Sequence, residues 1–252
     1  MSCHEKVLSH VFLDAVFTNF EILAQEDPES AALIAGKNVS IMFVAGIGGP
    51  KATITIRNSQ IKVTPGKVGN PDIIMFFPIA RWMTNMLSKK GFGIPFPLIM
   101  PWSLLKASGL LTFIKLGDRL DAILQGPNPP KKLKAKLLLN TIAKTIAAIC
   151  NNEPESRATA STLKGIAELR IKDGEAVNIL FSGNNDVVGR TGHADDFDLL
   201  MEFIDEDFFL QVADDKVDLM VSITLGDMVL SGDLHMGDVV NTYLDKVGVY
   251  LQ

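Results

Sequence analysis

The chain has 252 residues, of which 47% are hydrophobic and 21% charged, and its formal net charge is −5 at pH 7. This balance is typical of a globular protein with a substantial core, and the negative charge argues against a nucleic-acid surface. Two cysteines, Cys3 and Cys150, are too few for a disulfide framework. No uninterrupted apolar run approaches the roughly 18 residues that span a bilayer, and the N-terminus lacks a signal-peptide pattern. We therefore expect a soluble, cytoplasmic protein.

The first half alternates between helical and strand periodicity. A long helix is expected first, followed by a short helix that begins near Pro28. The period then changes to two, as in half-buried strands. Helices are expected at 5–25, 29–35 and 78–89, and strands at 39–44, 52–57, 61–64 and 72–77.

The fifteen residues of 91–105 contain no charged side chain. Pro95, Pro97 and Pro101 exclude a regular helix and a central strand, so we expect a loop. A loop of this composition either is a buried connector over the core or walls a lipid pocket, and the sequence leaves both open.

After a linker at Gly126 to Pro130, the pattern of the first half returns. Shifted by 126 residues, the helical apolar positions coincide, and Pro28-Glu29-Ser30 falls on Pro154-Glu155-Ser156. Shifted by 114, Asp72-Ile73-Ile74 falls on Asp186-Val187-Val188, and shifted by 123, Ser108-Gly109 falls on Ser231-Gly232. We interpret this as a tandem duplication, with domains at 1–126 and 127–252. The second copy lacks the uncharged loop, and its alternating residues from Val217 to Leu225 predict a strand.

The element order, the short PDIIMFF strand and the Ser-Gly turns resemble the sterol carrier protein type 2 family. Ser231-Gly232-Asp233-Leu234 is similar to that family's Ser-Gly-Asp turn, whereas the first copy has Leu110 in place of the aspartate. The resemblance implies an α+β domain with helices on one face of a mostly antiparallel sheet. It also implies an apolar tunnel for a fatty acyl chain, sterol or similar lipid, and binding without catalysis.

The first copy is predicted to be the binding copy, and no cofactor is expected. Methionines near the uncharged segment suit varied apolar ligands, although the same residues are also what a filled core would contain. The alternative is a structural or protein-interaction module, such as a homodimer, in which the segment is buried at the contact. The predicted lipid-binding residues are Met75, Phe77, Trp82, Met83, Met86, Leu87, Phe92, Ile94, Phe96, Leu98, Met100, Trp102, Leu105, Leu110 and Phe113.

No catalytic residue or metal ligand is predicted. His193 lies beside Asp195 and Asp196, but two acids there also suit the first turn of a helix, and we favour that interpretation. His235 is expected at the surface. No phosphate loop, nucleotide fingerprint or nucleophile motif is present.

Two charged stretches remain. Four lysines at the start of the second copy's first helix either touch an anionic membrane or pair with the acidic half, and we favour the second interpretation. Residues 195–218 hold ten acids against one lysine, which suits a basic partner or simply keeps the protein soluble. The four lysines are Lys131, Lys132, Lys134 and Lys136.

Overall fold

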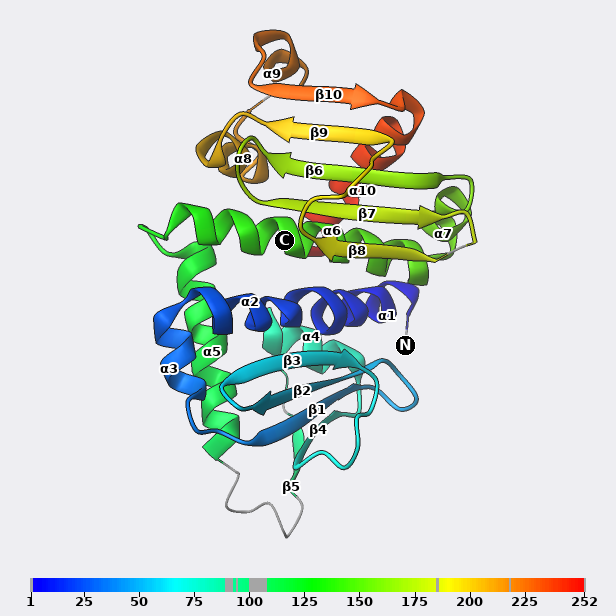
Figure 1. Cartoon of the computed structure of the whole chain (residues 1–252). Coiled ribbons are helices and arrows are strands. Elements are labelled where there is room, and N and C mark those ends of the chain that lie inside the picture. The colour runs from blue at the N-terminus through cyan, green and yellow to red at the C-terminus, as the bar shows by residue number, and fades with distance from the viewer. Residues whose placement is uncertain are drawn as a thin grey trace. The chain divides into compact units, whose positions relative to one another are not determined.

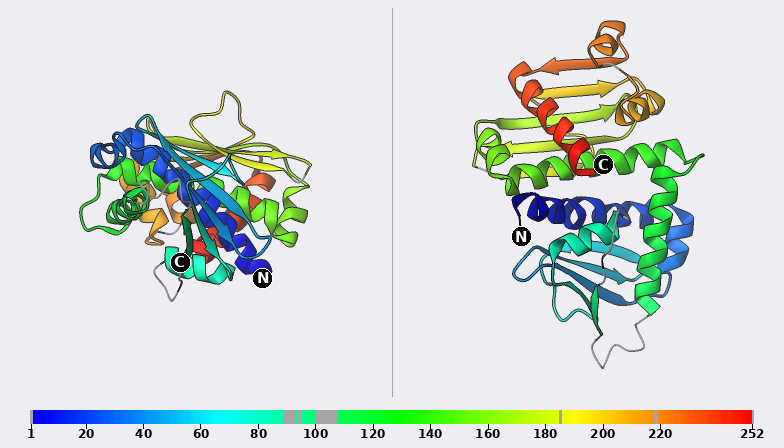
Figure 2. Two further views of the ribbon diagram at one scale, coloured as in Figure 1. Left: turned by 90° about the horizontal axis from the view of Figure 1, so that it is seen from below. Right: turned by 180° about the vertical axis from the view of Figure 1, so that it is seen from behind.

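The chain divides into two compact units, Met1–Gly126 (unit 1) and Pro127–Gln252 (unit 2). The structure, a computed structural model, describes residues 2–88, 93, 95–99, 108–184, 186–217 and 219–251, with backbone alone at 97–99, 219 and 220. In each unit, helices cover one face of a five-stranded sheet (Figure 1; Figure 2, right). The predicted α+β class is confirmed.

Unit 1 opens with a helical stretch that contains one π-helical turn and then one 3-10 turn. Ser2 and Glu5 cap its start, because each side chain accepts the other's backbone N–H. The elements are α1 (Cys3–His10), the π-helical turn η1 (Val11–Ala15), the 3-10 turn η2 (Val16–Thr18), α2 (Asn19–Glu26), α3 (Pro28–Ile34), β1 (Val39–Ala45), β2 (Lys51–Arg57), β3 (Gln60–Pro65), β4 (Ile73–Phe77), α4 (Ala80–Leu87), β5 (Phe96–Ile99) and α5 (Ser108–Gln125).

The strands of unit 1 lie in the order β3-β2-β1-β4-β5. β1 and β4 are parallel, and the other three pairs are antiparallel, as expected for a mostly antiparallel sheet. β2 and β3 are joined by Asn58 and Ser59, whose φ angles of 53° and 58° are those of a two-residue hairpin turn. The four strands predicted before residue 78 are therefore confirmed.

β5 corrects the expectation that all of 91–105 is a loop. Its Phe96 lies opposite Phe76 of β4, and its Ile99 lies opposite Ile73. Pro97 is compatible with pairing because β5 is the edge strand, where a missing N–H need not break the ladder. Of the rest of the segment, only Gly93 and Pro95 belong to the described residues.

Unit 2 repeats this order of elements and adds the helix α9, which has no counterpart among the described residues of unit 1. α9 corrects the strand expected from Val217 to Leu225: it is helical from Leu219 to Leu225. The elements are α6 (Lys131–Asn152), α7 (Pro154–Ala160), β6 (Lys164–Ile171), β7 (Ala176–Ser182), β8 (Val187–Thr191), β9 (Leu199–Phe203), α8 (Glu206–Ala213), α9 (Leu219–Leu225), β10 (Met228–Gly232) and α10 (Leu234–Leu251).

The two sheets have the same topology. The order β8-β7-β6-β9-β10 matches that of unit 1, with β6 and β9 as the parallel pair. Register matches as well: Ile41 lies opposite Ile73 in unit 1, and Ala167 lies opposite Leu199 in unit 2, each 126 positions later. The counterpart of β4 is therefore β9.

This register overturns two of the offsets inferred from sequence. Asp72-Ile73-Ile74 corresponds to Asp198-Leu199-Leu200 rather than to Asp186-Val187-Val188, because β8 is the edge strand. Likewise Ser108 and Gly109 lie in α5, whereas Ser231 and Gly232 end β10. Both mismatches arose from short stretches of similar sequence that do not share a place in the fold.

One carboxylate fixes the parallel pair in each unit. The Asp72 carboxylate accepts the backbone N–H of Ser40 at 2.9 Å, and the Asp198 carboxylate accepts that of Ile166 at 2.8 Å. The Ser40 hydroxyl also donates to Asp72. Because each aspartate directly precedes its strand, it sets where the strand meets its neighbour.

In each unit an ion pair joins the last helix to the start of the short helix that precedes the first strand. Arg119 of α5 contacts Asp27 at 2.8 Å, and Asp27 also caps α3 through the Ser30 N–H. In unit 2, Lys246 of α10 pairs with Glu153, which precedes α7. The two acids occupy equivalent positions at the two helix starts.

Four phenylalanines fill the space between helices and sheet in unit 1. Phe113 of α5 lies 4.9 Å from Phe43 of β1, 5.7 Å from Phe17 and 5.4 Å from Phe20, measured between ring centroids. All four rings are buried. The stretch Cys3–Glu26 that supplies Phe17 and Phe20 is long and apolar enough to span a membrane by length and composition, a test that buried core helices also pass.

Candidate ligand-binding site

The predicted lipid-binding residues that the structure describes centre on β4 and α4. The core of unit 1 contains Met75 and Phe77 of β4 and Met83 of α4, and all three are buried. Trp82, Met86 and Leu87 are only half-buried. Along α4, Trp82 and Met86 lie to one side of the buried Met83 and Leu87 lies to the other, so half-buried apolar side chains border the packed face of the helix.

Gly93, a residue of the uncharged segment, lies against α4 at Trp82 and Met86. A Cβ atom at Gly93 would lie 1.9 Å from the carbonyl oxygen of Trp82 and 3.1 Å from Cβ of Met86. Only glycine permits so close an approach of backbone to helix. At Gly93 the segment thus lies against the backbone of Trp82 and the side chain of Met86.

The remaining predicted residues are not all in one place. Phe113 belongs to the packed phenylalanine cluster, and Leu110 is half-buried near the start of α5, where Leu111 is 62% exposed. Phe96 is 53% exposed and, by register with Phe76, lies on the opposite face of the sheet from Met75 and Phe77. Leu98 lies in β5 opposite Ile74. Phe92, Ile94, Met100, Trp102 and Leu105 lie outside the described residues.

Unit 2 treats the same helix differently. The residues of α8 that stand 126 positions after Trp82 and Met83 are Phe208 and Phe209, and both are buried. The Phe209 ring lies 5.1 Å from that of Phe203. The half-buried apolar side of α4 is thus not a requirement of the fold.

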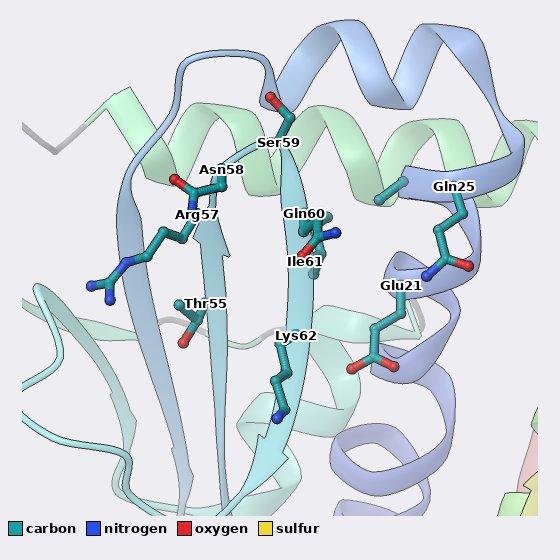
Figure 3. Close-up of a pocket in the computed structure, with 10 residues that line it drawn as sticks. Glu21, Gln25, Thr55, Arg57, Asn58, Ser59, Gln60, Ile61 and Lys62 are labelled. Atoms are coloured by element: carbon teal, nitrogen blue, oxygen red, sulfur yellow. The ribbon is translucent and has the colours of Figure 1, made fainter.

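A polar pocket of about 480 Å³ lies between α2 and the β2–β3 hairpin, away from every predicted residue. Figure 3 shows Glu21 and Gln25 of α2 directed toward β3, while Arg57 extends away from α2. Glu21 is engaged structurally, because its carboxylate accepts the Val63 N–H at 2.6 Å and so pairs an edge-strand donor. The pocket mixes the half-buried carboxylate of Glu21 with the exposed cations of Arg57 and Lys62, and no sequence signal indicated it. Its lining is Glu21, Ala24, Gln25, Thr55, Arg57, Asn58, Ser59, Gln60, Ile61 and Lys62.

The sequence suggested that His193 and its neighbouring acids lie at the start of a helix, and the structure shows that this is wrong. His193 lies with Asp195 and Asp196 in the connection between β8 and β9, which crosses the sheet (Figure 1). Its ring is 3.2 Å from the buried Glu168 carboxylate, which also accepts the Ala194 N–H. Across the part of the chain that the structure describes, no three His, Cys, Asp or Glu side chains are placed to hold a metal.

The lysines at the start of α6 contact acids of their own unit. Lys131 lies 2.7 Å from Asp207, Lys136 lies 3.2 Å from Glu175, and Lys132 lies 3.9 Å from the same glutamate. The pairing with acidic residues that the sequence favoured is therefore observed for these three.

The buried polar groups of unit 2 have a structural role. Burial raises the pKa of the Cys150 thiol to about 12, which keeps it protonated and unreactive. Burial alone would raise the pKa of Glu153, but hydrogen bonds from Lys246, Ser156 and Tyr250 lower it below its ordinary value. The Tyr243 hydroxyl donates to the Ser156 carbonyl oxygen at 2.8 Å. These contacts fasten α10 to the start of α7.

No protein family and no curated protein matches the sequence. Among solved structures, the fold is similar to Sterol Carrier Protein 2 from Yarrowia lipolytica (TM-score 0.30, 18% identity, 40% of this chain and 92% of that one). It is also similar to Sterol Carrier Protein 2 Like 2 from Aedes aegypti (TM-score 0.29, 17% identity, 41% and 87%). A sec-alkylsulfatase from Pseudomonas sp. overlaps with 57% of this chain and 28% of its own (TM-score 0.28, 13% identity).

Proposed function

We propose that this protein binds an apolar ligand such as an acyl chain without catalysis, and that unit 1 is the binding unit. The observation that carries the proposal is the pair of half-buried side chains Trp82 and Met86, which lie one turn apart on α4. Both are uncharged, and Gly93 of the uncharged segment 91–105 lies against the helix at these two residues. The sequence resemblance to the sterol carrier protein type 2 family is the second support.

The physical basis is the transfer of apolar surface out of water. Each CH₂ group of an acyl chain gains about 0.8 kcal/mol when it leaves water, so a long chain is held without any charged or catalytic group. Met86 adapts to ligands of different shape because its side chain is unbranched. Cys3 and Cys150 are free thiols, which fits the cytoplasmic location that we propose.

We propose further that the two units arose by duplication and that unit 2 is not a lipid-binding copy. Shared topology, register and anchoring aspartates support a common origin. Phe208 is buried where unit 1 has the half-buried Trp82, which supports a different use of this helix in unit 2.

The test compares one position in the two units. Met86→Asp places a charge on the proposed binding side of α4, and Val212→Asp places it at the matching, equally half-buried position of α8. Binding of a fluorescent C18 fatty acid is expected to fall at least about tenfold in Met86→Asp and to stay within about twofold in Val212→Asp. Circular dichroism checks that both variants remain folded.

Mass spectrometry of the denatured wild-type protein adds an independent readout, because copurified lipid is expected. The proposal is contradicted if the wild-type protein contains no copurified lipid and does not bind the fluorescent fatty acid. If Phe96→Asp then converts a dimer to a monomer, the interaction module is the better description, since Phe96 is exposed on an edge strand.

A further inference from the structure

Unit 2 has an open groove between α8, α9 and the turn into β10, at one end of its sheet (Figure 1). It measures about 480 Å³. Phe208 and Ser222 are its buried members, whereas Ile204, Val221 and Leu225 are 45%, 54% and 71% exposed. These three aliphatic side chains form a continuous apolar lining that its own unit leaves largely in contact with water.

Carboxylates surround the apolar lining. Asp205, Asp207 and Asp227 line the same groove, and a second hollow of about 320 Å³ shares Asp205 and Asp207 and adds Glu206. This second hollow is also lined by Lys131 and Lys132, and Lys131 pairs with Asp207. The groove therefore combines exposed aliphatic carbon with a mainly negative rim.

The fold does not require this surface. The positions 126 residues before Asp205, Glu206 and Asp207 are Ile79, Ala80 and Arg81, and α4 starts at Ile79 without a side-chain cap. The same helix is thus built in unit 1 with one cation and no acid at its start. The acids are a property of unit 2 alone.

We propose that this groove is the docking surface for a basic amphipathic segment of a partner protein. Aliphatic side chains of the segment would cover Val221 and Leu225, and its Lys or Arg side chains would face Asp205 and Asp227. Charge complementarity of this kind sets register and speeds association. A small cationic ligand fits less well, because it would leave the exposed side chains of Leu225 and Val221 in contact with water, whereas a longer segment covers them as well. The proposal concerns unit 2 and does not depend on lipid binding by unit 1.

The probe is a fluorescein-labelled 14-residue peptide of Leu and Lys at helical spacing, with a Leu/Glu twin of the same apolar pattern. Fluorescence anisotropy is measured against the full chain, and binding of the Leu/Lys peptide is expected to weaken as salt is raised. The variant Leu225→Lys adds a cation in the groove at an exposed position. Leu234→Lys is the matched control, since Leu234 is 66% exposed and does not line the groove.

The expected result is at least about a tenfold loss of affinity for Leu225→Lys and less than about a twofold change for Leu234→Lys, with no binding of the Leu/Glu peptide. Asp227→Lys is expected to resemble Leu225→Lys. Equal losses for Leu225→Lys and Leu234→Lys would overturn the proposal, because they would indicate general attraction to an acidic protein. So would no measurable binding of the Leu/Lys peptide, or a wild-type dimer that Leu225→Lys dissociates, because the occupant would then be a second copy.

Discussion

Unit 1 starts the helix after its parallel strand with Ile79, Ala80 and Arg81, and unit 2 starts the same helix with Asp205, Glu206 and Asp207. Around this difference the backbone is held alike, by an aspartate at each strand start and by the same register. Residues that pair backbone groups are therefore shared by the two units, whereas the side chains at the start of this helix differ.

The cores differ in a similar way. Phe43 and Phe113 centre the aromatic cluster of unit 1, whereas unit 2 places Leu169 at the position of Phe43. The core of unit 2 includes Tyr243, a fully buried side chain whose hydroxyl has a backbone partner. One topology thus accepts two different packings, provided that the total volume fills the space.

The largest effect is expected from emptying one core. Phe43→Ala should lower the stability of unit 1 by about 3–5 kcal/mol, because it removes a ring from the centre of the cluster. Leu169→Ala is its partner experiment in unit 2, with an expected cost of about 2–5 kcal/mol. Hydrogen exchange followed by mass spectrometry should show lost protection in 1–126 for the first variant and in 127–252 for the second. Loss across both units in either variant would show that they unfold together.

A smaller effect is expected from the ion pair of unit 1. The Arg119 guanidinium lowers the pKa of Asp27, and Arg119→Met leaves that carboxylate, only 5% exposed, without its cation. We expect a loss of about 2–3 kcal/mol at pH 7, less than for a fully buried pair because the Arg119 side chain keeps 26% exposure.

The pH dependence gives this prediction a second readout. Because the folded-state pKa of Asp27 is depressed, its contribution is complete above the unfolded value of about 3.9 and is lost as the pH falls through the folded value. Urea unfolding should therefore show a larger drop in stability from pH 7 to pH 2 in the wild type than in Arg119→Met. Identical drops would mean that Asp27 is not stabilised by Arg119.

The smallest effect concerns one hydroxyl of α6. Thr145 is fully buried, and its hydroxyl has no hydrogen-bond partner within the described part of the chain. Thr145→Val should raise stability by about 1 kcal/mol, seen as a higher Tm. Thr141→Val in the same helix is the control, since its hydroxyl donates to the Leu137 carbonyl oxygen at 2.8 Å and its loss should destabilise. A lower Tm for Thr145→Val would mean that its hydroxyl is paired in solution.

Periodicity was sufficient to predict the sheet and its main helices, because alternating and helical patterns report burial directly. It failed at α9, where Val217 to Leu225 alternates but the chain is helical from Leu219. Proline chemistry correctly excluded a central strand at Pro97, but it does not exclude an edge strand, and β5 is one.

The candidate site was less accessible to sequence reasoning. Apolar residues of α4 were identified as a group, but spacing does not show that Met83 is buried while Trp82 and Met86 remain half-buried. The groove of unit 2 was missed because its members come from α8, α9 and the turn into β10. The acidic run from 195 to 218 was the signal that pointed toward it.

The anchoring aspartates have a consequence for exchanging surface segments between the two units. Since Asp72 and Asp198 begin equivalent strands in equivalent register, the segment from Asp72 to Leu87 and that from Asp198 to Ala213 have the same length and the same attachment points. Exchanging the two segments therefore requires no change in chain length, and the resulting chimera would show directly which surface properties of each unit reside in this segment.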